Sequence, residues 1–155
     1  MPGMVHLLVD AFPGSLSHED NDGWIPLHRL CRNEKINDEV GLEILELLVE
    51  KCPESVRHTT RKGMLPIHTA AGRQSPEYCR ILIEACPGSE RIAANDGIFP
   101  FHAACQYNTV ATAKYLYQLY PESISVADDK GHYPIHYAIS GLKYGEDRPE
   151  TVDFV

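Results

Sequence analysis

The sequence predicts an all-α solenoid, in which antiparallel helix pairs stack along one axis and hairpin-like loops project from one side. Pro-x-His triplets recur with separations of 40, 34 and 34 residues, at Pro26, Pro66, Pro100 and Pro134. A second set of prolines keeps the same separations, each with serine two residues later, at Pro13, Pro53, Pro87 and Pro121. Since two independent markers share one register, we interpret the chain as a repeat protein with a period of about 34 residues.

The markers divide the 155 residues into one domain of three full units and two partial units. The full units are predicted at 21–60, 61–94 and 95–128, between a partial N-terminal unit at 1–20 and a partial C-terminal unit at 129–155. Residues 4–12 are expected to form a second helix without its first, and 149–155 the opening of a second helix. Because an uncapped solenoid end exposes a face meant for a neighbour, we expect flanking repeats of a longer protein, or another chain, to cover both ends.

Each unit is predicted to begin with a tight turn and a short first helix. A charged residue stands directly before glycine at Gly23, Gly63, Gly97 and Gly131. Glycine can adopt the positive φ that the tip of a hairpin requires. The proline three residues later suits the first position of a helix, because it lacks only an N–H that would be unpaired there. Mostly small residues follow, such as Ala70 and Ala104, so the first helix can lie close to its neighbours.

Larger apolar side chains mark the second helix, which is predicted at 42–49 in the first full unit and at 78–83 in the second. Ser75, directly before Pro76, is a suitable N-cap. Two extensions, at 32–39 and 141–148, fall in the loop between the helices of a unit, where a solenoid tolerates insertion. These extensions are interpreted either as neutral loop growth or as loops that contact a partner.

The four Gly-x-x-Pro-[Leu/Ile/Phe]-His segments, followed by small apolar residues, resemble ankyrin repeats, and the resemblance covers nearly the whole chain. It implies a stack of antiparallel helix pairs with projecting β-hairpin loops. Ankyrin repeats usually have threonine before the proline, where it caps the first helix. Four apolar or aromatic residues stand there instead: Ile25, Leu65, Phe99 and Tyr133. Losing such a cap costs about 0.5–2 kcal/mol, so we expect packing of these side chains between successive units to offset it.

Charge and composition exclude several classes of function. Lys and Arg number 14 against 22 Asp and Glu, for a net charge of −8 without any basic run, which argues against binding to nucleic acid or to an anionic membrane surface. No apolar run approaches the roughly 20 residues that span a bilayer. The five cysteines form no CxxC pair, so reduced thiols in a cytoplasmic or nuclear protein are expected.

The recurring histidines and cysteines are not expected to form a metal site or an active site. Stacked units hold His28, His68, His102 and His136 about 10 Å apart, whereas zinc needs ligands within about 2.0–2.3 Å of one point. Each imidazole is expected to bond to backbone in its own or the next hairpin, and Cys31 and Cys105 to be buried. No phosphate loop, HExxH or GxSxG motif is present. We therefore predict no enzymatic activity, no cofactor, no metal and no small-molecule substrate.

Surface residues are the remaining candidates for function. The residues after the tip glycines, three of them large and apolar, are Trp24, Met64, Ile98 and His132. They indicate a binding ridge, unless they fold down onto neighbouring hairpins and extend the core. Further candidates line the first helices: Arg29, Arg32, Thr69, Arg73, Gln106, Tyr107 and Tyr137. The sequence thus predicts a protein–protein interaction scaffold that binds a protein through hairpin tips and a concave helix face; the alternative is a structural spacer in a larger repeat protein.

Overall fold

A computed structural model describes residues 2–107 and 109–142, and it confirms the all-helical architecture. Three helix pairs form its centre: α2 (Pro26–Arg32) with α3 (Asp38–Lys51), α4 (Pro66–Arg73) with α5 (Pro76–Ala85), and α6 (Pro100–Gln106) with α7 (Val110–Leu119). The helix α1 (Pro2–Ala11) precedes these pairs, and α8 (Pro134–Gly141) follows them. Among the described residues, no helix is long and apolar enough to cross a membrane.

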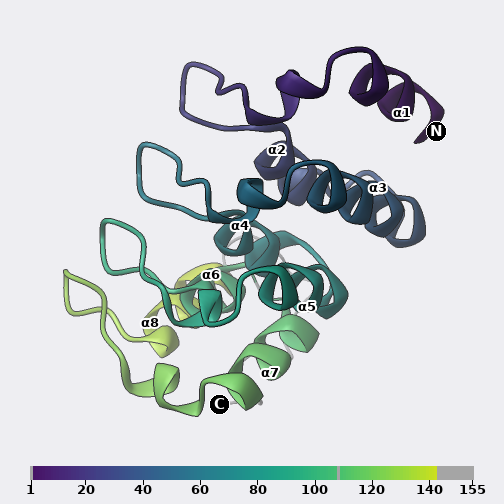
Figure 1. The fold of residues 1–155 in the computed structure, drawn as a ribbon. Coiled ribbons are helices and arrows are strands. Elements are labelled where there is room, and N and C mark those ends of the chain that lie inside the picture. Colours follow the sequence, from purple (N-terminus) through teal and green to yellow (C-terminus); the bar gives the residue numbers. More distant parts are fainter. Residues whose placement is uncertain (1, 108, 143–155) are drawn as a thin grey trace.

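The helices form two rows. The first helices α2, α4, α6 and α8 pack against one another in chain order, and the second helices α3, α5 and α7 form a parallel row beside them. Four loops project from the same side of the stack, one before each first helix (Figure 1). This arrangement is the predicted solenoid of helix pairs, and it places the loop tips and the first helices next to one another.

Short 3₁₀-helices reverse the chain after each second helix. They are η1 (Pro13–Ser17), η2 (Pro53–Arg57), η3 (Ser89–Arg91) and η4 (Pro121–Ser125). Three of the four serines in the second sequence marker, Ser15, Ser55 and Ser123, donate the hydroxyl hydrogen to the backbone carbonyl three residues earlier, whereas the buried Ser89 hydroxyl does not. The donor–acceptor distance is 2.6 Å from Ser55 to Cys52 and 2.7 Å from Ser123 to Tyr120.

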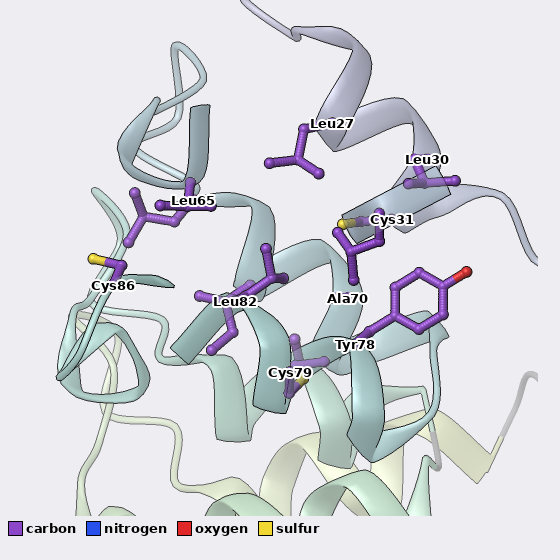
Figure 2. Packing of buried hydrophobic residues seen from close by; sticks show 14 of the residues in the cluster. Leu27, Leu30, Cys31, Leu65, Ala70, Tyr78, Cys79, Leu82 and Cys86 are labelled. Atoms are coloured by element: carbon purple, nitrogen blue, oxygen red, sulfur yellow. The ribbon is translucent and has the colours of Figure 1, made fainter. Parts of the chain in front are cut away.

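The core lies between the two rows of helices. Figure 2 shows Leu27 and Cys31 of α2 pointing into the same space as Ala70 of α4 and Leu82 of α5. The small residues of the first helices, predicted to allow close packing, are fully buried: Cys31, Ala70, Ala71, Ala104, Cys105 and Ala138. Small side chains at these positions let consecutive first helices approach one another, so the hairpins that precede them also stand close together.

The recurring histidine bonds to the start of its own helix. In three units the backbone N–H of the residue before the proline donates to histidine Nδ1, at 3.0 Å from Leu65 to His68, 3.0 Å from Phe99 to His102 and 2.8 Å from Tyr133 to His136. Because Nδ1 accepts, the proton of a neutral imidazole is on Nε2. This hydrogen bond satisfies one backbone donor at the start of the helix, a position for which no threonine cap is available.

Two of the histidines also bond to backbone farther along the chain through Nε2. His28 Nε2 lies 3.1 Å from the Met64 carbonyl oxygen, and His102 Nε2 lies 2.9 Å from that of Val126. These bonds confirm that the imidazoles bond to backbone in their own or the next hairpin. Within the described residues, His28 Nδ1 and His68 Nε2 find no partner, so only His102 makes both bonds in full.

The residues that replace threonine differ in burial. Ile25 and Leu65 are buried in the core, as expected, and Phe99 is half-buried with its ring centroid 6.0 Å from that of Tyr120. Tyr133 is exposed, so the expectation of apolar packing is wrong for this unit. At Leu65, Phe99 and Tyr133 the backbone N–H at the helix start is satisfied by the histidine, a contribution that the sequence reasoning did not anticipate, whereas the unit of Ile25 lacks this bond.

Two local expectations around the first extension also need correction. The predicted loop at 32–39 is shorter, since α3 already begins at Asp38, and its N-cap Asn37 accepts from the Val40 N–H at 2.9 Å. Ser75 occupies the N-cap position of α5, but its hydroxyl donates to the Asp38 carboxylate at 2.9 Å and makes no capping bond. An ionised carboxylate is a stronger hydrogen-bond partner than a neutral backbone group, so the Ser75 hydroxyl bonds to Asp38 at the start of α3 and joins two units. Of the second extension, residues 143–148 lie outside the described residues, as does 149–155.

Gly41 of α3 has a packing role that periodicity does not reveal. A Cβ atom at this position would lie 1.8 Å from the hydroxyl oxygen of Tyr78 and 3.0 Å from its Cζ. Tyr78 is fully buried on α5, so its ring has no free space into which it could move. The close approach of α3 to α5 therefore depends on glycine at position 41.

We expect Gly41→Ala to lower the free energy of unfolding by about 1–3 kcal/mol, because overpacking outweighs the better helix propensity of alanine. Urea unfolding checks this, with Gly3→Ala as the matched control. Gly3 also lies in a helix but has no heavy atom within 4 Å of an added Cβ. The control is expected to be unchanged or slightly more stable; a Gly41→Ala protein as stable as the original would contradict the packing argument.

Buried histidines predict a loss of stability in mild acid. Burial lowers the pKa of His28 and of His68 from 6.5 to about 4. Between these values the unfolded chain binds protons that the folded chain excludes, so the free energy of unfolding falls as pH falls, by about 1.4 kcal/mol per pH unit for each histidine. Urea unfolding between about pH 7 and about pH 5 measures the slope. The slope of the free energy of unfolding against pH should be smaller in His68→Gln than in the original chain. Equal slopes in the two proteins would refute the assignment of this pH dependence to His68.

Candidate protein-binding surface

The four hairpins share one backbone geometry. Each is closed by a pair of hydrogen bonds, for example Asp20 N–H to the Trp24 carbonyl at 2.9 Å and Gly23 N–H to the Asp20 carbonyl at 3.0 Å. The tip glycines all have positive φ, between 75° and 83°. Neighbouring hairpins are joined by further backbone bonds, from Asn95 to Lys62 and from Asp129 to Asp96, both at 3.0 Å. The tips therefore form an ordered row rather than independent loops.

The residues that follow the tip glycines are only partly exposed. Trp24, Met64 and Ile98 are half-buried, whereas His132 is exposed. The Trp24 ring is covered by two arginines, with the guanidinium carbon of Arg29 5.0 Å and that of Arg32 5.6 Å from its centroid. Arg29 Nε also donates to Asp20 at 3.0 Å, which ties the helix α2 to its hairpin. Trp24, Met64 and Ile98 are thus each partly packed and partly exposed, which combines the two expected behaviours.

The candidates on the first helices α2 and α4 are unequally accessible. Arg29 and Arg32 are exposed on α2, and Arg73 is half-buried on α4. The Arg73 guanidinium lies 4.6 Å from the ring centroid of Tyr107, which is exposed after the end of α6. Thr69 is buried, so of the predicted residues it offers the least surface to a partner. The middle of the surface is therefore formed by the stacked Arg73 and Tyr107.

A depression of about 230 Å³ lies at the C-terminal end of this surface. It brings together four of the predicted residues, Ile98, Gln106, His132 and Tyr137, from two hairpins and from the helices α6 and α8. Its remaining lining is mostly polar and comprises Asp96, Asp128, Lys130, His136 and Ser140. The tertiary structure thus unites residues that are up to 39 positions apart, from Ile98 to Tyr137.

Asp128 organises the walls of the depression. Its Oδ1 accepts from the backbone N–H groups of Lys130 and His132, each at 2.9 Å, and its Oδ2 accepts from the Tyr137 hydroxyl. Burial alone would raise the pKa of this carboxyl, but the hydrogen bond from Tyr137 and the backbone bonds hold the pKa well below its usual value. The carboxylate stays ionised at neutral pH and positions both the hairpin and the Tyr137 ring.

A second depression, of about 370 Å³, lies at the N-terminal end of the surface. Trp24 and Arg29 line it, together with Phe12, His18 and Asp20. Six of the predicted residues therefore line the two depressions at opposite ends of the row, and the predicted pair of Arg73 and Tyr107 lies between them.

Sequence reasoning missed the aspartates at the base of the hairpins. Asp20 and Asp128 stand at the same position of their units, three residues before the tip glycine, and both accept backbone N–H groups of the turn. Asp-x-x-Gly is a turn pattern, because an aspartate side chain can bond to the backbone two residues on. The signal was present in two units, whereas Thr60 and Ala94 occupy the position in the other two.

The described residues contain no group of three or more His, Cys, Asp or Glu side chains arranged to hold a metal ion. Cys31 and Cys105 are buried, as expected, and burial raises the pKa of the Cys105 thiol to about 12. A thiol with such a pKa stays protonated at neutral pH and is a poor nucleophile.

Comparison with known proteins agrees with the repeat geometry. A family model of ankyrin repeats, in three copies, matches residues 37–121, more than half of the chain. A comparison with curated proteins found no match. The matched residues include α3 to α7 and the two central hairpins, and therefore the middle of the surface described above.

We expect Tyr137→Phe to lower the free energy of unfolding by about 1–3 kcal/mol, because Asp128 loses a hydroxyl donor and remains buried and charged. Tyr133→Phe is the matched control, since Tyr133 is exposed, and its effect should stay within about 0.5 kcal/mol. Urea unfolding at neutral pH compares the two variants. Equal stability of both would show that the Tyr137 hydroxyl does not support the carboxylate.

Proposed function

The chain belongs to the ankyrin-repeat family, and on this premise we propose that it is a non-enzymatic scaffold that binds a protein partner. Ankyrin repeats are generally protein–protein interaction modules, and the family is typically non-enzymatic. The proposed contact surface runs along the row of hairpin tips and the first helices α2, α4, α6 and α8. No nucleic acid, membrane, cofactor or small-molecule substrate is part of this proposal. All five cysteines are free, which supports a cytoplasmic or nuclear setting.

The observation that carries the proposal is the depression at the C-terminal end of the surface. Ile98 supplies an apolar wall, while Gln106, His132 and Tyr137 supply groups that can donate or accept hydrogen bonds. Bonds to backbone and the buried Asp128 hold this arrangement in place. A surface that is ordered before binding loses less conformational entropy on association, which favours affinity.

The surface also offers anchors of the kind that dominate protein interfaces. Tyr, Trp and Arg are enriched among residues whose truncation weakens binding most. Trp24, Arg32 and Tyr107 are of these types; Trp24 lies in a hairpin, and the other two lie at the C-terminal ends of α2 and α6. Since Arg29 is already bonded to Asp20, Arg32 is the better candidate for contact with a partner carboxylate.

The second candidate function is a structural spacer in a larger repeat protein, with no partner of its own. The half-buried Trp24, Met64 and Ile98 favour it, because side chains packed onto neighbouring hairpins contribute to stability without a partner. The two functions differ in one measurable property, the retention of a specific protein by this surface.

Affinity capture from a source extract tests the proposal, with Arg32→Ala, Ile98→Ala and His132→Ala combined in one variant. We expect it to lose a partner that the original chain retains, with affinity reduced about tenfold or more, because anchors on one face act together. The matched control carries Glu46→Ala and Glu50→Ala, two exposed positions on α3 away from the first helices, and should retain the partner.

Both variants must unfold at the same urea concentration as the original chain, so that loss of binding is not loss of fold. A partner retained by the face variant would place the contact surface elsewhere. Absence of any specific partner for all three proteins would favour the spacer.

A further inference from the structure

The two rows of helices (Figure 1) differ in charge. Apart from histidine, the charged side chains on the first helices α2, α4, α6 and α8 are all arginines: Arg29, Arg32 and Arg73. On the second helices α3 and α5, acidic side chains outnumber basic ones. In a chain whose net charge is −8, the row of first helices is therefore locally basic. A local excess of positive charge on a contact surface favours acidic groups on the partner.

Arg32 can bind such a group without giving up an ion pair. Its side chain is exposed at the C-terminal end of α2, and its guanidinium carbon lies 5.6 Å from the Trp24 ring centroid. Among the described residues, no carboxylate forms an ion pair with it. Arg29, in contrast, already donates to Asp20. The guanidinium of Arg32 therefore keeps its N–H donors for an anion.

The neighbouring unit holds Arg73, the second cation, in place. Its guanidinium carbon lies 4.6 Å from the Tyr107 ring centroid. The ring in turn lies against α4 at Gly72, where an added Cβ would be 2.7 Å from the ring Cδ2. Glycine at this position thus makes room for the ring that supports the arginine. An arginine over an aromatic ring still presents N–H groups at its edge, in the fork geometry that matches a carboxylate.

We propose that the partner binds through an extended acidic segment, and that two carboxylates of this segment bind Arg32 and Arg73. This inference rests on the proposed function and adds the chemistry of the partner. Packed helices such as α2 and α4 lie about 8–10 Å apart, and an extended chain rises about 3.3 Å per residue. Two acidic residues that are two or three positions apart in the segment therefore span the two arginines.

The other end of the surface limits where the acidic residues can bind. Asp96 and Asp128 line the depression between α6 and α8, and the Asp128 carboxylate is ionised at neutral pH. Like charges in contact oppose binding, so this end disfavours further carboxylates. The acidic part of the segment therefore lies over α2 and α4, and an uncharged part lies toward Ile98.

Glu34 competes with the partner for one of the two arginines. It lies in the loop between α2 and α3, and its Oε1 is 3.7 Å from Arg73 Nη1. This distance is too long for a hydrogen bond, and both side chains are partly exposed, so the pair is weak. A partner carboxylate can displace Glu34, and removal of the Glu34 charge should strengthen binding.

Selection from a library of random peptides of about ten residues, displayed on phage, tests the proposal with the immobilised full chain. The enriched peptides should contain at least two acidic residues spaced two or three positions apart. One enriched peptide is then labelled with fluorescein, and its affinity for the original chain and for variants is measured by fluorescence anisotropy.

Arg32→Gln and Arg73→Gln should each weaken binding of this peptide about fivefold or more, because each removes one charged contact. Glu34→Gln should strengthen it about twofold or more. The matched controls are Arg80→Gln on α5 and Glu46→Gln on α3, which make the same changes of charge on the second helices. Both controls should bind like the original chain, which separates a local contact from an effect of net charge.

Urea unfolding confirms that every variant is folded. Enriched peptides that are neutral or basic would overturn the inference and leave the proposed function in place. A library that yields no binder would also overturn it, and the proposed function would then be decided by affinity capture. Unchanged affinity in folded Arg32→Gln and Arg73→Gln, or weaker binding to Glu34→Gln, would overturn the assignment of these residues.

Discussion

The structure depends on buried, neutral imidazoles that bond to backbone at two places. His102 shows the arrangement in full, since Nδ1 accepts from the N–H at the start of its own helix and Nε2 bonds to the Val126 carbonyl, just before the last hairpin. Burial lowers the pKa of this histidine, which keeps the ring uncharged and the two nitrogens in distinct roles. His28 Nε2 reaches the Met64 carbonyl and thereby connects its helix to the next unit.

The other features follow from bonds of this kind between units. Backbone hydrogen bonds join the last three hairpins to one another, and His28 reaches the second hairpin from α2, so the tips form an ordered row. Small residues on the first helices keep the spacing of the units short, and Gly41 and Tyr78 do the same between second helices. The depression around Ile98 and Tyr137 is a consequence, because side chains from separate units can define one site only where the units cannot shift relative to each other.

Some apolar residues on α1 and α8 are exposed, in contrast to their buried counterparts in the middle of the stack. A repeat buries its apolar face by contact with neighbours, so where no neighbour is described the same residue types stay in water. Leu8 and Ile139 are core residues by type and by position in the repeat, yet both are more than half exposed.

The sequence by itself determined the repeat, its period and the all-helical fold, because two proline markers in one register leave few alternatives. It also determined that the histidines serve the backbone. Tertiary structure decided the hydrogen-bond partners and the burial of individual residues. Ser75 bonds to Asp38 rather than to its own helix, and Asp128 organises the walls of the depression. Tyr133 lies in solvent, whereas Leu65, at the same position of its unit, is buried. The physical reason is that a residue's local pattern sets its conformation, whereas its burial and its hydrogen-bond partner depend on which side chains the neighbouring unit supplies.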